Sequence, residues 1–127
     1  MRWFCCTGHG WDIYVLVYRT VKSMRVGIKR GVTNPPTGLQ KAGAMCAYYD
    51  VKTRRCDIYL ALDYLTYNTV SHELYHAVRR MAKVNRKRKR QCGEEWQATM
   101  HGELVNFVIW KLRTLGFSPK VDRDIIG

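Results

Sequence analysis

The first half of the chain carries the hydrophobic patterns of β-strands. Residues 11–20 are rich in β-branched and aromatic side chains, which favours a strand that is covered on both faces or partly exposed through its tyrosines. Residues 24–29 then alternate between apolar and polar positions, as a strand with one buried face does. We therefore expect these two segments to pair as a hairpin, after a short and turn-rich start at residues 3–10.

A second pair of strands is expected after a loop. Residues 31–43 contain two consecutive prolines, followed closely by a glycine, a composition that ends a strand and does not begin a long helix. Residues 44–50 and 56–62 come next as strand candidates, and in the second of them one buried face is predicted by the alternation of apolar and polar positions. These patterns predict a small, mostly antiparallel sheet of about four strands within residues 11–62.

The second half of the chain shows the periodicity of two helices. At about 100° per residue, apolar positions form a stripe along residues 68–84, and two histidines lie on nearly the opposite side. The stripe consists of Val70, Leu74, Ala77, Val78 and Met81. Asn68 is the expected N-cap. A second helix is predicted for residues 94–115, with Gly116 just after its last turn and a C-terminal tail over residues 116–127.

The first of these helices contains an HExxH motif, His72-Glu73-Leu74-Tyr75-His76. Its histidines are four residues apart, so a helix brings both imidazoles to one side, where they can hold a single metal ion. Glu73 can accept a proton from a metal-bound water, whose pKa zinc lowers to about 7. An ordinary amphipathic helix with two solvated histidines is the alternative. The motif predicts a Zn²⁺ site with His72 and His76 as ligands and Glu73 as the catalytic base.

A catalytic zinc site needs a third protein ligand, because its fourth position is kept for water. Glu94 and Glu95 begin the second predicted helix. Glu95 shares one side of that helix with residues that have short side chains, Thr99, Gly102 and Asn106. Such a side lets another helix approach closely. Glu94 falls on the apolar side, where a carboxylate is costly unless it is coordinated or paired. Periodicity alone leaves both glutamates open.

The run from Glu95 to Val105 resembles the third-ligand helix of gluzincin metallopeptidases, the thermolysin-like class. In that class the ligand glutamate follows HExxH at a similar interval, and a glycine commonly stands seven residues after it, as Gly102 does after Glu95. The resemblance implies that Glu95 is the third zinc ligand. The chain departs from the class at Thr99, where those enzymes have an aspartate that orients a histidine.

The chain also resembles small phage-encoded proteins with the pattern SHExxHA, a short spacer and EExxAxxxG. Ser71 to Ala77 and Glu94 to Gly102 fit the two parts of this pattern. The resemblance implies a minimal zincin of the α+β class, formed as a single domain by residues 1–127, and suggests an origin in a phage or another mobile element. In zincins, the strand near the motif helix is commonly an antiparallel edge along which an extended peptide lies.

Length, apolar content and cysteines narrow the class of protein. A chain of 127 residues is expected to form one domain with a single core. No segment is apolar over the length that spans a bilayer, and the first 20 residues lack the core of a signal peptide. We expect a cytoplasmic protein, in the host cytoplasm if it is phage-encoded, without membrane contact. The five cysteines contain no CxxC pair and suit reduced thiols, although Cys92 is an alternative ligand by its place in the sequence.

The chain is strongly basic, with 22 Lys and Arg against 10 Asp and Glu and a formal charge of +12. The densest run lies in a loop predicted at residues 85–93 and consists of Arg86, Lys87, Arg88, Lys89 and Arg90. This run is either a solvated loop or a contact surface for nucleic acid or another acidic partner. Binding of nucleic acid there would be independent of base sequence and would weaken with salt.

The favoured prediction is a zinc-dependent metallopeptidase that acts on a peptide or protein substrate. A donor for the oxyanion of the transition state would complete its site, and the candidates are Tyr75, Tyr67, Tyr64 and His101. The alternative is a non-catalytic phage or mobile-element protein whose basic surface binds nucleic acid or a host partner, with zinc as a structural element.

Overall fold

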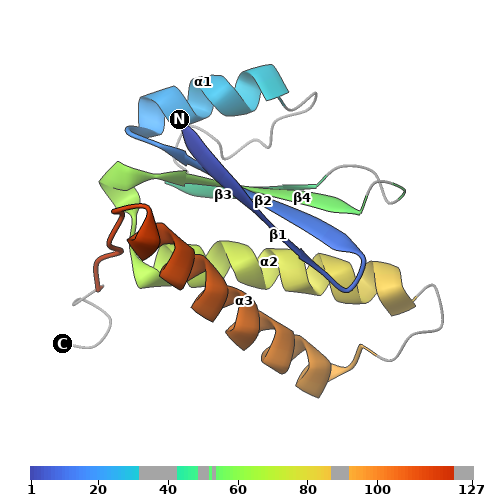
Figure 1. The fold of residues 1–127 in the computed structure, drawn as a ribbon. Helices are drawn as coiled ribbons and strands as arrows, with labels where there is room; N and C mark the ends of the chain where they lie inside the picture. Colours follow the sequence, from blue (N-terminus) through green and yellow to red (C-terminus); the bar gives the residue numbers. More distant parts are fainter. Residues whose placement is uncertain (32–42, 49–51, 53, 87–91, 122–127) are drawn as a thin grey trace. The chain divides into compact units, whose positions relative to one another are not determined.

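The computed structural model describes residues 1–31, 43–48, 52, 54–86 and 92–121, drawn in colour in Figure 1. Its contacts divide the chain into two compact units, residues 1–65 and residues 66–127. The first unit contains a mixed sheet and one α-helix, and the second contains two α-helices. The prediction of an α+β protein is therefore confirmed. The single domain expected from the chain length stays a prediction.

The sheet of the first unit has four strands in the order β1-β2-β4-β3. The strands are β1 (Arg2–Gly8), β2 (Trp11–Tyr18), β3 (Ala44–Tyr48) and β4 (Arg55–Ala61). β1 pairs with β2 and β3 pairs with β4 in antiparallel fashion, whereas the central pair, β2 and β4, is parallel. About four strands and the hairpin of β3 with β4 were predicted, and both are confirmed. The sheet is mixed, however, and begins at residue 2 rather than residue 11.

The strand predicted at residues 24–29 is wrong, because this segment belongs to helix α1 (Val21–Gly31), which lies against one face of the sheet in Figure 1. Met24 and Ile28 are one helical turn apart, and both are completely buried. Val26, which the strand prediction placed on the same face, is 44% exposed. The six-residue alternation therefore concealed a helix, which buries two of the three apolar residues in that segment.

The first hairpin is formed by β1 and β2, in place of the hairpin predicted between residues 11–20 and 24–29. Its turn is confined to His9 and Gly10, which have φ angles of 53° and 79°. Two consecutive residues with positive φ suit a two-residue hairpin turn, because its twist matches that of the strands.

β4 is a central strand, and residues 56–61 are all buried. The prediction of a single buried face is wrong for this segment. A parallel neighbour and an antiparallel neighbour flank the strand, and side chains on both of its faces are buried. After β4, a short 3₁₀ helix, η2 (Leu62–Tyr64), ends the first unit.

The second unit is built from α2 (Tyr67–Arg86) and α3 (Glu94–Thr114). The predicted helices, residues 68–84 and 94–115, end within two residues of these bounds. None of the described helices is long and apolar enough to cross a bilayer. Of the predicted tail, residues 122–127 lie outside the described residues.

Local hydrogen bonds cap the start of α2 and the end of α3. Thr66, rather than the predicted Asn68, caps the start of α2, because its Oγ1 accepts a hydrogen bond from the N–H of Thr69 at 3.0 Å. Gly116 follows α3 as predicted and has a φ of 89°. The N–H of the next residue donates to the carbonyl oxygen of Leu112 at 2.8 Å, which closes the helix as in a Schellman motif.

Candidate metal centre

Helix α2 separates a packing side from a side that presents two histidines. The predicted apolar stripe is buried along its whole length, with no member more than 1% exposed. His72 and His76 are both exposed, as the helical pattern predicts. Their Nε2 atoms are 3.2 Å apart, and their ring centroids are 4.8 Å apart with the rings nearly perpendicular. The four-residue spacing therefore directs the two ring nitrogens toward one point in space.

Glu73 lies beside these histidines but is buried, with 6% of its surface exposed. Its Oε2 atom is buried and has no hydrogen-bond partner among the described residues. One ligand atom each from His72, Glu73 and His76 fall within 4.8 Å of one another. In the described part of the chain, this is the one group of His, Cys, Asp or Glu residues that could hold a metal ion.

Burial shifts the pKa values of Glu73 and His76 in opposite directions. It raises the pKa of Glu73 above the usual value, and the positive charge of nearby His72 offsets part of that rise. Burial also lowers the pKa of His76, and the neighbouring charge of His72 lowers it further. A neutral imidazole can ligate a metal, and a carboxylate that accepts a proton more readily than usual is suited to act as a base.

Glu94 and Glu95 lie in the first turn of α3, and both are exposed. Neither belongs to the group formed by the two histidines and Glu73. The short side chains that accompany Glu95 along α3 are also exposed, and a Cβ added to Gly102 would meet no atom within 4 Å. The interpretation of this side as a close contact with another helix is therefore wrong. The role of Glu95 as a third ligand stays a prediction.

Two polar contacts fix how α2 and α3 lie side by side. Arg79 Nη1 donates to Gln97 Oε1 at 3.0 Å, and His101 Nε2 lies 2.9 Å from the carbonyl oxygen of Ser71. His76 lies between Ser71 and Arg79 in α2, so it is level with the segment of α3 between Gln97 and His101. Glu95 precedes that segment. Gln97 is 8% exposed, and neither this residue nor its contact with Arg79 was expected from the sequence.

The predicted oxyanion donors occupy different places. His101 is part of the contact with Ser71, and its ring meets the ring of Tyr75 edge to face at 5.9 Å between centroids. Tyr75 is 51% exposed, and its ring centroid is 6.4 Å from that of His76. The Tyr67 hydroxyl accepts a hydrogen bond from Arg113. Tyr64 is 59% exposed in the first unit. Of these candidates, Tyr75 is the one whose contact with a motif histidine is described.

The predicted basic loop is mostly outside the described residues. α2 extends to Arg86, so its last two residues fall within the segment predicted as loop, while Lys87, Arg88, Lys89 and Arg90 are not described. Cys92 is 4% exposed, and its carbonyl oxygen accepts a hydrogen bond from Gln97 Nε2 at 3.1 Å. Its thiol is not a member of the group around His72.

No protein family, characterised protein or solved structure matches this chain.

Proposed function

We propose that the chain is a zinc-dependent metallopeptidase of minimal, zincin-like architecture. In this proposal His72 and His76 are two ligands of the zinc ion, and Glu73 is the general base. The observation that carries it is the pair of Nε2 atoms held 3.2 Å apart beside a buried carboxyl whose Oε2 has no described partner.

The separation of the two nitrogens fits a shared zinc ion. Two nitrogen ligands at about 2.0–2.1 Å from one tetrahedral zinc are about 3.3–3.4 Å apart. The Nε2 atoms of His72 and His76 are 3.2 Å apart without any rearrangement. The same distance also suits a hydrogen bond between the two rings. Metal analysis therefore has to decide whether the two imidazoles share a zinc ion or only a hydrogen bond.

Glu73 has the position and environment of a general base. A buried acceptor without a partner costs about 1–3 kcal/mol of folding free energy. Packing alone therefore does not explain why a carboxyl occupies this position. When bound, zinc supplies a Lewis acid and lowers the pKa of a coordinated water to about 7. Glu73 takes the proton from the attacking water, and its raised pKa helps it hold that proton until the leaving amine accepts it.

The third ligand in the proposal is Glu95, because of the resemblance to gluzincins, with Glu94 as the alternative. Metal analysis of protein purified without chelator tests the ligands one by one. We expect about one zinc per chain in the parent protein and a large loss in His76→Ala, because one ligand is removed. His9→Asn is the control, since this histidine lies in the turn between β1 and β2 and outside the group, and it should keep its zinc. Glu95→Ala and Glu94→Ala, compared side by side, then assign the third ligand.

Cleavage of a quenched fluorescent peptide library tests the reaction. Glu73→Gln should keep its zinc and its circular dichroism spectrum but lose activity by about 10²–10⁴-fold, because the base is removed while the ligands remain. The proposal fails if the parent protein binds no metal, or if Glu73→Gln cleaves peptides at the parent rate.

The formal charge of +12 favours the second candidate, a non-catalytic protein that binds nucleic acid or an acidic host partner, with zinc as a structural element. This candidate predicts metal binding without any cleavage of the peptide library. It also predicts that Glu73→Gln leaves binding to the partner unchanged, so the same variant separates the two functions.

A further inference from the structure

A basic groove lies along α1 in the first unit, away from the histidine pair in the sequence. It has a volume of about 830 Å³. Its cationic side chains, called here the groove cations, are Arg19, Lys22 and Arg30. No Asp or Glu is among the described residues that line it. The charge of the lining therefore favours an anion over a cation.

The groove has a length and an aromatic wall that suit an extended ligand. Lys22 and Arg30 are eight residues apart on α1, which is about 12 Å along the helix axis. The wall is the ring of Tyr18, which stacks on Tyr59 at 6.3 Å between centroids. A Cβ on Gly27 would lie 2.4 Å from the Tyr18 hydroxyl oxygen, so the glycine is what lets the ring lie against the helix.

Aromatic side chains, one of them exposed, continue on the same face of the sheet beyond this groove. Tyr14 and Tyr18 are four residues apart in β2 and so lie on the same face of the sheet. Trp3 of β1 contacts Tyr14 across the strands at 5.8 Å between centroids, and it is 60% exposed. Trp3 therefore presents an aromatic surface to solvent next to Tyr14.

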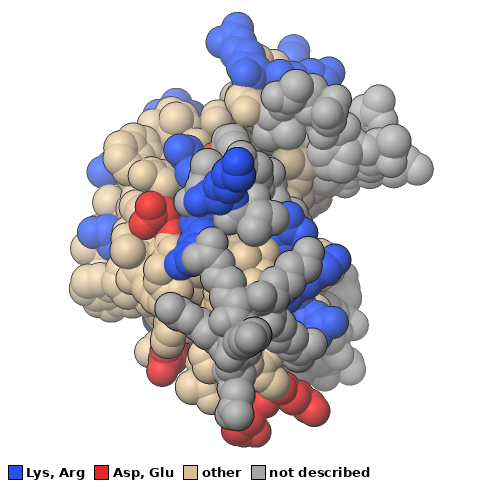
Figure 2. Space-filling model, turned by 90° about the vertical axis from the view of Figure 1, so that its right-hand side faces the viewer, with Lys and Arg blue, Asp and Glu red and all other residues tan. Residues whose placement is uncertain are grey.

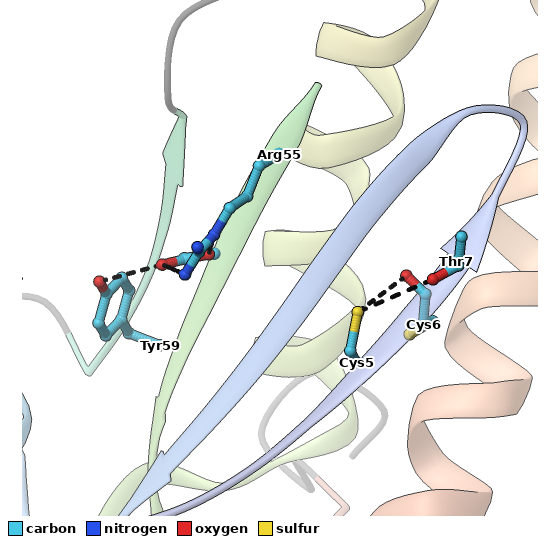
Figure 3. A network of polar contacts seen from close by, with 6 residues as sticks. Cys5, Cys6, Thr7, Arg55 and Tyr59 are labelled. Carbon is cyan, nitrogen blue, oxygen red and sulfur yellow. Dashed lines mark hydrogen bonds and ion pairs between the residues drawn. The ribbon is translucent and has the colours of Figure 1, made fainter. Parts of the chain in front are cut away.

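Arg55 of β4 lies over the ring of Tyr14. Its guanidinium carbon lies 4.1 Å from the centroid of Tyr14, and its Nε donates to Asp57 Oδ1 at 2.9 Å. Figure 3 shows Arg55 and the Tyr59 hydroxyl directed toward the same carboxylate. One face of the tyrosine ring is thus covered by a cation that is itself paired with a buried carboxylate.

We propose that the first unit binds single-stranded nucleic acid. The phosphates lie along the groove cations, and a base stacks on the exposed ring of Trp3. Single-strand binding of this kind combines a basic groove with aromatic side chains, because every base has a face that can stack. The formal charge of +12, and the Lys and Arg side chains spread over the face drawn in Figure 2, favour an anionic polymer at long range.

The residues of this site differ from those of the predicted basic loop, and the site does not depend on the proposed peptidase activity. All of its residues belong to residues 1–65 and none belongs to the HExxH helix. A zinc-free or Glu73→Gln protein should therefore bind the strand as well as the parent does. Failure of the peptidase proposal leaves this proposal standing, and the reverse also holds.

Fluorescence anisotropy with a labelled oligothymidylate of about 15 nucleotides tests the proposal, because this strand has no duplex structure of its own. The groove variant changes all three groove cations to glutamine. The control variant changes to glutamine three exposed lysines that do not line the groove, Lys29, Lys83 and Lys120. Both variants lower the formal charge from +12 to +9, so they differ in the location of the lost charge and not in its amount.

We expect the groove variant to bind at least about tenfold more weakly than the control variant at low salt, and its salt slope to be smaller by about two. Trp3→Ala should weaken binding by about tenfold, since a stacked base is lost. Trp110→Ala removes a tryptophan of equal exposure, 59%, from α3 and should have little effect. Circular dichroism checks that each variant folds.

Four results would overturn the proposal. The first is that the parent protein does not bind the strand. The second is that the groove variant and the control variant bind equally. The third is that Trp3→Ala is no weaker than Trp110→Ala, and the fourth is that a duplex of the same length binds as tightly as the single strand.

Discussion

Replacing Glu73 by methionine should stabilise the metal-free protein, the reverse of what happens when a structural polar group is removed. Glu73 is 6% exposed, and its Oε2 has no partner among the described residues. A buried acceptor without a partner costs about 1–3 kcal/mol, and methionine fills a similar volume without the oxygens. We expect the free energy of unfolding to rise by about 1–3 kcal/mol, or the melting temperature by about 3–12 °C.

The gain should grow with pH, in a direction set by the pKa of Glu73. Burial raises that pKa above the usual value, so over an interval of pH the folded state keeps a proton that the unfolded state has released. The carboxyl therefore favours the unfolded state increasingly as the pH rises above the usual carboxyl range. In chelator, the variant should exceed the parent clearly at about pH 7.5 and much less at about pH 4.

Urea unfolding followed by circular dichroism measures both effects, with Gln97→Met as the matched control. Gln97 is also buried on a helix, but its amide bonds to Arg79 and to the carbonyl oxygen of Cys92. Its replacement should cost about 1 kcal/mol or more, because partners are lost. If Glu73→Met unfolds at lower urea than the parent in chelator at neutral pH, Glu73 has a structural role and the reasoning is refuted.

Three further predictions concern the rest of the chain. Thr66→Ala should lower the free energy of unfolding by about 1 kcal/mol through loss of the α2 cap, whereas Thr99→Ala on the exposed side of α3 should change it little in urea unfolding. Gly116→Ala should destabilise by about 1 kcal/mol because of its positive φ, and Gly102→Ala, inside α3 with free space around it, should stabilise by about 0.5–1 kcal/mol. Burial, helped by the charge of the adjacent cysteine, raises the pKa of Cys6 to about 12. At about pH 8 its thiolate is then about one part in ten thousand, and mass spectrometry should find it alkylated far more slowly than in urea.

The two helices of the second unit could be predicted almost to the residue, because their pattern extends over many turns. α2 repeats its apolar positions from Val70 to Met81, and every one of them is buried. α3 ends where Gly116 permits a positive φ. Long patterns with an end signal leave few alternatives, so local information was sufficient here.

The first unit was predicted less well, because short segments have competing patterns. Met24, Val26 and Ile28 alternate as in a strand, yet Met24 and Ile28 also have helical spacing. The helix is favoured by reciprocal caps at its start, where Thr20 Oγ1 accepts from the N–H of Ser23 at 3.1 Å and Ser23 Oγ accepts from the N–H of Thr20 at 3.3 Å. The parallel pairing of β2 with β4 joins strands that are distant in the chain, which periodicity does not encode.

Part of the candidate site depends on local sequence, and part depends on how distant segments pack. The convergence of His72 and His76 follows from one helix turn, so the sequence alone could predict it. A third ligand from α3 depends instead on how that helix is rotated and shifted along α2. In the structure, contacts such as Arg79 with Gln97 set this relation, and they leave Glu95 exposed and outside the group. A row of short side chains on α3 suits a solvent-facing side as well as a close helix contact, so periodicity could not choose between them. A loss of zinc in Glu95→Ala but not in Glu94→Ala would therefore mean that α3 takes a different position along α2 when the metal is bound.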